Sequence, residues 1–432
     1  MPFSNLMLSN KMQTTINALG YTKPTAIQQK AIPILRKGRD ILATSQTGTG
    51  KSASFILPMV ENLPEREDIR VGDDRYKIDA LILAPTRELV VQIHNSIESY
   101  SKSFTHKSVA LYGGMRLGSQ VKDIRAGANI AVATTGQLLK HIKNKTINLS
   151  IVKIVVIDEA DKMLEMGFID DIRAIISKLP KKRQSAMFSA TFSTTLMRLA
   201  KSFLNNPLTV EIEGDISAKE ITQLVHYINE EQKAPLLAHI LKEKDAKGVL
   251  VFANTKRESN ILVEKLEQEG IKSVAIHGDK SQSMRDKALT DFKKGLVKVL
   301  IATDVVARGI DIKNLPLVIN FELPIKNEDY IHRIGRTGRA KEHGEAISLV
   351  CEKEVSQFEE LEGILNIKLP KVTTEGFSYN PSLKLSSRKI KQKDVKDSEK
   401  LRKAKELAEK MMNRGKKVEK IVTKRGRNKR HF

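Results

Sequence analysis

The stretch that decides the fold is Ile154-Val155-Val156-Ile157-Asp158-Glu159-Ala160-Asp161. Its four β-branched residues predict a strand buried on both faces, as the strands of parallel sheets are. The acids follow directly, so we expect them at the carboxyl edge of the sheet, where α/β proteins bind ligands. There Asp158 is suited to hold Mg²⁺ and Glu159 to orient a water, although a lone acidic quartet can also simply cap a helix.

A second short apolar run, Ile41-Leu42-Ala43-Thr44, leads into Ser45-Gln46-Thr47-Gly48-Thr49-Gly50-Lys51-Ser52. This segment matches the phosphate-binding loop pattern, except that Ser45 stands in place of the first glycine. Glycines let backbone N–H groups turn towards phosphates, and the following helix adds a favourable dipole. We expect Lys51 to reach the β- and γ-phosphates and Ser52 to bind Mg²⁺. The loop residues expected to contact the nucleotide are Thr47, Gly48, Thr49, Gly50, Lys51 and Ser52.

Composition limits the class of protein. A chain of 432 residues is too long for one core, and its net charge of +23 with a pI near 9.8 favours a polyanionic partner. Cys351 stands alone, so no internal disulfide or multi-cysteine metal site is expected. No secretory signal and no apolar stretch of membrane-spanning length is visible. We therefore expect a cytoplasmic nucleic-acid-binding protein without a membrane segment.

Strands alternate with helices in two similar halves, which predicts an α/β fold with two parallel sheets. We place the first domain at 1–212, a linker at 213–220, the second domain at 221–370 and a C-terminal extension at 371–432. From residue 380 onward there are 20 Lys and Arg against 6 Asp and Glu, a net +14. This composition predicts a largely disordered basic tail that binds RNA phosphates, or one that only keeps the protein soluble.

The second half lacks a phosphate-binding loop, which suggests one nucleotide shared between two domains. Its most cation-rich segment is His332-Arg333-Ile334-Gly335-Arg336-Thr337-Gly338-Arg339. Arg336 and Arg339 share a face on a helical turn and are candidates to stabilise charge on a γ-phosphate. An arginine pair also fits a solvated helix face, but the interleaved glycines favour close approach of the backbone to a ligand. A further segment, 302–311, follows a predicted strand and is expected to contact a ligand as well.

Taken together, these segments resemble the motifs of the DEAD-box RNA helicases over about residues 3–350. The stretch 277–282 and the basic tail are most similar to the bacterial RhlE-type branch. The matching motifs, in chain order, are the Q motif at 20–28 with Phe3 as its upstream aromatic, then 43–52, 85–89, Gly113-Gly114, 158–161, 189–191, 251–252 with Gln282 and Arg285, 302–311 and 332–339.

The resemblance implies two tandem RecA-like domains that close on ATP, Mg²⁺ and RNA, hydrolyse ATP and separate short RNA duplexes. It implies catalytic roles for Lys51, Asp158, Glu159, His332, Arg336 and Arg339. It implies contacts to adenine or ribose for Tyr21, Gln28 and Asp311, and metal binding for Ser52 and Asp158. It implies coupling between the domains for Asp161, Ser189, Thr191 and Arg308. The implied RNA contacts are Pro85, Thr86, Arg87, Gly113, Gly114, Thr134, Asn254, Gly278, Gln282, Arg285 and Thr303.

Several alternatives stay open at this level. Tyr21 can stack on the base or be an ordinary aromatic at a helix start. Gln137 stands where the family usually has an RNA-facing arginine, so weaker contact with the RNA backbone is expected there. A non-enzymatic RNA clamp and a DNA translocase share parts of this pattern, although the intact Lys51 and Glu159 disfavour the first. Ribosomal precursors and RNA-decay proteins are both compatible partners, and a monomer is expected.

Overall fold

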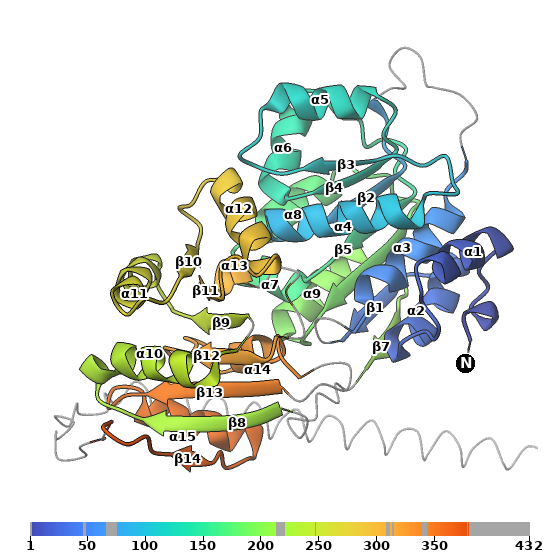
Figure 1. Ribbon diagram of the computed structural model, residues 1–432. Coiled ribbons are helices and arrows are strands. Elements are labelled where there is room, and N and C mark those ends of the chain that lie inside the picture. The colour runs from blue at the N-terminus through green and yellow to red at the C-terminus, as the bar shows by residue number, and fades with distance from the viewer. Residues whose placement is uncertain are drawn as a thin grey trace, which may run out of the picture. The chain divides into compact units, whose positions relative to one another are not determined.

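The computed structural model describes residues 2–45, 49–65, 76–212, 221–246, 248–307, 312, 315–338, 344–377 and 379. They contain two seven-stranded parallel sheets (Figure 1). Both sheets belong to one compact unit of the chain, which ends at Tyr379. Within these ranges, none of the helices combines the length and the apolar character needed to cross a membrane. The prediction of two parallel-sheet α/β domains is confirmed.

The first sheet has the order β3-β4-β2-β5-β6-β1-β7. Its strands are β1 (Ile41–Thr44), β2 (Ala80–Leu83), β3 (Ser108–Leu111), β4 (Ile130–Ala133), β5 (Ile154–Ile157), β6 (Gln184–Ser189) and β7 (Leu208–Glu211). The helices of this half are η1 (Phe3–Asn5), α1 (Asn10–Ala18), α2 (Ala26–Arg36), α3 (Lys51–Asn62), α4 (Arg87–Tyr100), α5 (Leu117–Arg125), α6 (Thr135–Lys143), α7 (Ala160–Glu165), α8 (Ile169–Ile176) and α9 (Thr194–Phe203).

The second sheet has the order β10-β11-β9-β12-β13-β8-β14. Its strands are β8 (Ile221–Tyr227), β9 (Val249–Phe252), β10 (Ser273–Ile276), β11 (Val299–Ala302), β12 (Leu317–Asn320), β13 (Gly344–Val350) and β14 (Lys371–Val372). The helices of this half are η3 (Glu230–Gln232), α10 (Lys233–Lys244), α11 (Lys256–Gln268), α12 (Gln282–Lys293), α13 (Asp304–Ala307), α14 (Glu328–Ile334) and α15 (Val355–Leu365).

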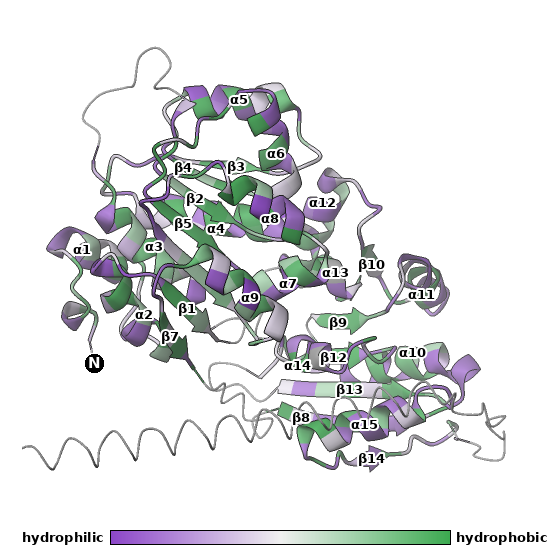
Figure 2. Ribbon diagram, turned by 180° about the vertical axis from the view of Figure 1, so that it is seen from behind, coloured by the Kyte–Doolittle hydropathy of each residue, from purple (hydrophilic) through white to green (hydrophobic). Residues whose placement is uncertain are grey.

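The central strand β5 shows why the acids lie where they do. All four of its residues are buried, and their side chains alternate between two hydrophobic cores. Ile154 and Val156 pack with α2, α3 and α4 on one face, whereas Val155 and Ile157 pack with α7, α8 and α9 on the other. A strand buried on both faces has no room for a charge until it ends, so the chain places Asp158 just beyond it. Figure 2 shows the strands of the first sheet as largely hydrophobic ribbons between helices of mixed character.

The hydrophobic runs of the sequence predict strands near 41, 81–84, 130–133, 154–157, 185–188, 208–212, 249–252, 273–276, 299–302, 317–320 and 346–350. Three strands of the structure are missing from this prediction. They are β3, which is only half-buried along one face, β8, which alternates polar with apolar residues, and β14, which is two residues long. All three lie at or next to a sheet edge, where burial is one-sided and the hydrophobic signal is weak. The strand β14 begins at Lys371, one residue past the limit predicted for the second domain. The predicted linker 213–220 and the tail from residue 380 lie outside the described residues.

Candidate functional site

The predicted phosphate-binding loop lies between β1 and α3. The Ser45 N–H donates to the Ser189 carbonyl at 3.1 Å, and the buried Lys51 ammonium donates to the Ser45 carbonyl at 2.8 Å. Gly50 has φ +89°, a conformation that favours glycine, and α3 begins at the next residue. Thr49, Gly50, Lys51 and Ser52 thus follow strand β1 as the sequence predicts, while Thr47 and Gly48 lie outside the described residues.

Gln28 connects the start of α2 to this loop. Its Oε1 accepts from the Thr25 N–H at 3.0 Å, and its Nε2 donates to the Gly50 carbonyl at 3.2 Å. A Cβ added at Gly50 would lie 2.5 Å from this Nε2, so only glycine allows the contact. An amide has a second N–H and a second lone pair. The side chain can therefore hold the loop and still form further hydrogen bonds.

The two aromatic candidates differ in their surroundings. Tyr21 is partly exposed, and its hydroxyl lies 3.1 Å from that of Tyr100, the last residue of α4. Phe3 is buried in the core of the first sheet. In this arrangement Phe3 has a packing role, and Tyr21 remains the more accessible ring.

The acids after β5 form the electrostatic centre of the site. Asp158, Glu159 and Asp161 are all buried, and the Glu159 N–H donates to Asp158 Oδ1 at 2.9 Å. Burial raises the pKa of Asp158 even though the Lys51 charge opposes the shift. Burial and the neighbouring Asp158 charge raise the pKa of Glu159 to about 7. Among the described residues, Glu159 Oε2 is buried without a hydrogen-bond partner.

Asp161 joins these acids to the end of β6. Its Oδ2 accepts from the N–H groups of Ala190 and Thr191 at 2.9 and 3.2 Å, and from the Thr191 hydroxyl at 3.4 Å. The Ser189 hydroxyl donates to the Thr191 carbonyl at 2.9 Å. Burial alone would raise the pKa of Asp161, but Lys51 and the Ala190 N–H outweigh it and lower that pKa. The segment predicted to couple the acids to the rest of the molecule is therefore in contact with them.

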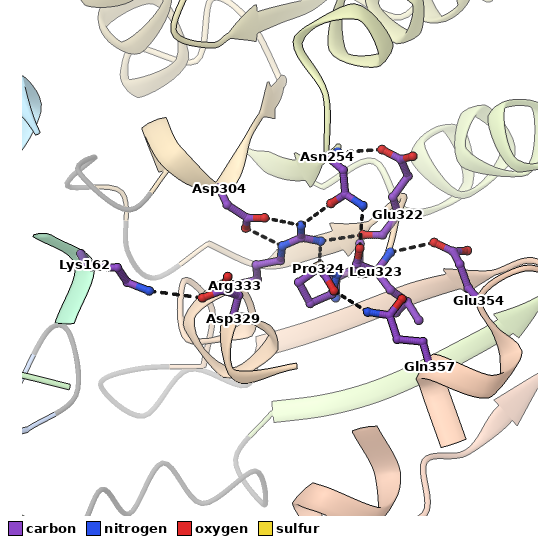
Figure 3. Close-up of polar contacts among 11 residues, drawn as sticks. Lys162, Asn254, Asp304, Glu322, Leu323, Pro324, Asp329, Arg333, Glu354 and Gln357 are labelled. Atoms are coloured by element: carbon purple, nitrogen blue, oxygen red, sulfur yellow. Dashed lines mark hydrogen bonds and ion pairs between the residues drawn. The ribbon is translucent and has the colours of Figure 1, made fainter. Parts of the chain in front are cut away.

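In the second domain, one arginine holds three segments together (Figure 3). Arg333 is 1% exposed and forms a two-point ion pair with Asp304, with Nε–Oδ1 and NH2–Oδ2 distances of 2.7 and 2.6 Å. It also donates to Asn254 Oδ1 at 2.8 Å and to the Glu322 carbonyl at 2.6 Å. Its guanidinium carbon also lies 4.9 Å from the centre of the Phe252 ring. The resemblance to the family did not assign a role to Arg333. Its partners come from segments that are far apart in the sequence and meet only in the folded sheet.

The other cations of this segment lie at the end of α14. Arg336 is buried, and its charge acts on Glu159 of the first domain, where it lowers the carboxyl pKa against the larger effect of burial. His332 precedes Arg333 in the same helix. Arg339, Arg308 and Asp311 lie outside the described residues. One of the two predicted arginines is thus placed within electrostatic reach of Glu159.

Most residues predicted to contact RNA line one groove of about 400 Å³. Arg285 forms a 2.5 Å ion pair across it with Glu88 of α4. Gly113 and Gly114 lie directly against the Arg87 side chain. A Cβ at Gly114 would lie 2.6 Å from the Arg87 guanidinium, so the close contact requires glycine there. The predicted residues that line the groove are Pro85, Thr86, Arg87, Gly113, Thr134, Gly278 and Arg285.

The remaining predicted RNA contacts are engaged within the second domain. Asn254 donates to the Leu323 carbonyl at 2.8 Å and accepts from Arg333, so its side chain braces this arginine. Gln282 accepts from Arg285 at 2.7 Å and donates to Asp286 at 2.9 Å. Thr303 is buried at the end of β11. Gln282 therefore orients an arginine of the groove.

Gln137, the residue that departs from the family pattern, is turned into the protein. It is 6% exposed, and its amide donates to Gln120 Oε1 at 3.4 Å. The buried His141 shares that acceptor at 3.3 Å and contacts the Thr146 hydroxyl at 2.8 Å. Burial lowers the pKa of His141. A neutral amide thus completes a polar network under the groove, at a position where an arginine would bring a charge.

Comparison with known proteins agrees with this geometry. Residues 25–199 match the DEAD/DEAH box helicase family and residues 232–341 match the helicase conserved C-terminal domain. DEAD-box ATP-dependent RNA helicase RhpA of Helicobacter pylori is 41% identical over 82% of this chain and 70% of its own length. ATP-dependent RNA helicase DeaD of Buchnera aphidicola is 39% identical over 86% of this chain, which spans 61% of that relative.

A solved structure shows the same arrangement of sheets. Dbp5 of S. cerevisiae, bound to RNA and ADP BeF3, is 33% identical with a TM-score of 0.76, over 86% of this chain and 95% of that one. The likeness therefore extends over both sheets and over the motifs at their edges. From these matches and from the site geometry, the chain belongs to the family of DEAD-box ATP-dependent RNA helicases.

Proposed function

We propose that this protein hydrolyses ATP in response to RNA and uses the cycle to clamp and locally unwind RNA. The observation that carries the proposal is the surroundings of Glu159. This carboxylate is buried beside Asp158 and Lys51, and one of its oxygens has no hydrogen-bond partner among the described residues. The positive charge of Arg336 from the second domain lowers its pKa against the larger effect of burial. A carboxylate with a pKa near 7 is suited to accept a proton from a water.

The nucleotide contacts follow from the loop and the acids. Lys51 and the N–H groups that precede α3 bind the phosphates, and Gln28 uses its remaining hydrogen-bonding capacity on adenine. Tyr21 stacks on the base, and Asp311 contacts the ribose. Thr47 and Gly48 complete the phosphate loop.

The donor set also fits Mg²⁺, because a buried carboxylate and a hydroxyl flank a lysine at the phosphate position. Ser52 and Asp158 would hold the ion, which neutralises phosphate charge when it is bound. Magnesium typically keeps few protein ligands and binds through substrate phosphates, so two ligands suffice.

In the chemical step, Glu159 takes the proton of the attacking water. Arg336, with Arg339, stabilises the negative charge that develops on the γ-phosphate. His332 belongs to the same catalytic group, while Arg308 joins Asp161, Ser189 and Thr191 in transmitting domain closure. Because Arg336 comes from the second domain, hydrolysis depends on the domains being together.

RNA lies along the groove that holds Arg87, Arg285 and Thr134. Its other contacts are Pro85, Thr86, Gly113, Gly114, Asn254, Gly278, Gln282 and Thr303. Small and singly charged side chains of this kind bind sugar and phosphate without reading the base sequence. The similar structure of S. cerevisiae Dbp5 is bound to RNA, which supports RNA as the ligand of this chain.

The branch of the family, the domain limits, the location and the partners are proposed from the sequence alone. The stretch 277–282 and the basic tail favour the RhlE-type branch, with domain limits at 212, 221 and 370. A cytoplasmic monomer that acts on ribosomal precursors or with RNA-decay proteins is consistent with the composition and with the excess of positive charge.

The test measures phosphate release by the purified protein with ATP alone, with single-stranded RNA and with DNA of the same sequence. We expect strong stimulation by RNA and little by DNA, together with ATP-dependent separation of a short RNA duplex. RNA binding without turnover would indicate a non-enzymatic clamp. Equal stimulation by DNA would indicate a translocase, and either result would overturn the proposal.

A further inference from the structure

A buried ion pair joins the two domains directly beside the catalytic acids. Lys162 follows Asp161 in helix α7, and its ammonium lies 3.2 Å from Asp329 Oδ1 in helix α14 (Figure 3). The two residues are 6% and 5% exposed. They lie 167 positions apart in the chain, so the contact depends on how the two sheets meet.

Both ends of the pair are attached to parts of the catalytic machinery. The Lys162 N–H donates to Asp161 Oδ1 at 2.9 Å, while the other Asp161 oxygen binds the Ala190 N–H. Asp329 lies one helical turn before Arg333, whose hydrogen bonds fix α14 to Asp304 and Asn254. Arg336 follows within the next turn. Neither partner sits on a free loop, so bringing the two together also fixes the position of Arg336.

We propose that Lys162 and Asp329 form a latch that stabilises the closed arrangement of the two domains and positions Arg336 towards Glu159. Neither residue touches the phosphates in this role, so both are positioning residues. The inference rests on the proposed function, because a latch matters only if closure drives hydrolysis.

The surroundings of the pair explain why it acts on closure. When the domains separate, both charges regain water, so each is stable in the open protein without its partner. On closure each charge loses water, and the opposite charge of the pair compensates for part of that loss. Lys162 also forms an ion pair with Glu165 of the same helix at 3.5 Å, so it has an anionic partner within the first domain.

The same boundary provides a matched control. Lys326 forms an ion pair with Glu165 at 3.7 Å, and its side chain is 52% exposed. Exposed pairs of this kind contribute little, because water and salt screen them. Lys326→Met thus removes the same charge from nearly the same place but leaves no buried partner.

The test compares Lys162→Met, Asp329→Leu, the double variant and Lys326→Met in the full-length protein. RNA affinity is measured with ADP BeF3 bound, and RNA-stimulated turnover is measured over a range of RNA concentrations. We expect each single change at the latch to weaken nucleotide-dependent RNA affinity on the order of 30-fold, as loss of one partner of a buried pair does. The half-stimulating RNA concentration should rise with it, while ATP binding without RNA stays unchanged.

The double variant separates a direct contact from general damage. If the two residues pair, it should lose no more affinity than the worse single variant, because the first change has already removed the contact that the second would break. Additive losses, or single variants that behave as Lys326→Met does, would overturn the latch. Wild-type protein that shows no RNA stimulation would instead overturn the proposed function.

Discussion

The two sheets have the same strand topology, but the residues that follow their strands have different surroundings. Each strand of the second sheet occupies the place of the strand seven earlier in the chain, so that β8 corresponds to β1 and β12 to β5. A buried lysine opens the helix after the corresponding strand in both halves: Lys51 in α3 and Lys233 in α10. The difference in function therefore comes from what surrounds each lysine, because the fold supplies the position twice.

The surroundings of the two lysines differ in how completely charge is paired. Lys233 donates to the Phe321 carbonyl at 2.8 Å and to the Glu354 carboxylate at 2.5 Å, so its partners come from within the second domain. Lys51 donates to the Ser45 carbonyl and faces buried acids whose pKa values are raised. One lysine thus stabilises the fold, while the other lies in a site that can respond to a ligand.

The acids that follow the corresponding strands show the same contrast. Glu159 is the second residue after β5, and Glu322 is the second residue after β12. Burial raises the pKa of both carboxyl groups. Glu322 Oε2 accepts from the Asn254 N–H at 2.6 Å, whereas Glu159 Oε2 has no partner among the described residues. An occupied acceptor is structural, and a buried carboxylate oxygen without a partner is suited to take a proton.

The largest expected effect comes from the acids. Glu159→Gln should lower RNA-stimulated turnover roughly 10²- to 10⁴-fold, because an amide keeps the shape but cannot accept the proton. ATP-dependent RNA binding should remain. Glu322→Gln is the matched control, since its amide oxygen can still accept from Asn254, and turnover should stay within a few-fold of the wild type. Phosphate release measures both, and equal losses in the two variants would remove the functional contrast between the sheets.

The two lysines should separate binding from stability. Lys233→Met leaves the Glu354 carboxylate buried without its cation and should cost about 3–5 kcal/mol of unfolding free energy. Lys51→Met leaves the acids next to it free to take up protons, so it should weaken ATP binding far more than it weakens the fold. Urea unfolding followed by circular dichroism, together with ATP titration, distinguishes these outcomes. A strongly destabilised Lys51→Met protein would mean that both lysines are structural.

A smaller effect is expected from pH. Burial and the Asp158 charge raise the pKa of Glu159 to about 7, and only its deprotonated form acts as a base. The kcat/KM for ATP should therefore fall about tenfold per unit as the pH decreases below 7, and level off above it. Since the Arg336 charge lowers this pKa, Arg336→Ala should move the profile to higher pH. A flat profile between pH 6 and 8 would contradict the role of Glu159.

Much of this arrangement could be predicted from the sequence, and the reasons are local. The run before Asp158 is buried on both faces, so its four β-branched residues carry a clear signal and place the acids at the sheet edge. Edge strands such as β3 and β14 carry a weak signal because they are buried on one side or are very short. Arg333 looked like any other cation of its segment, since its partners Asp304, Asn254 and Glu322 come from three separate strand ends. Interactions of that kind depend on the assembled sheet.

The smallest expected effect concerns residues 380–432, which lie outside the described residues. This segment carries a net charge of +14, so it can bind RNA without any of the motifs carried by the two sheets. Truncation after Tyr379 should leave RNA-stimulated ATP hydrolysis in place, because both sheets and their strand-end residues precede that point. The slope of log affinity against log salt should become shallower by about 0.7 for each phosphate of single-stranded RNA that the truncated protein no longer binds. Measuring RNA affinity at several salt concentrations, with and without the tail, shows whether the tail or the groove binds these phosphates. Identical slopes would mean that the two sheets bind every phosphate and that the tail serves a protein partner.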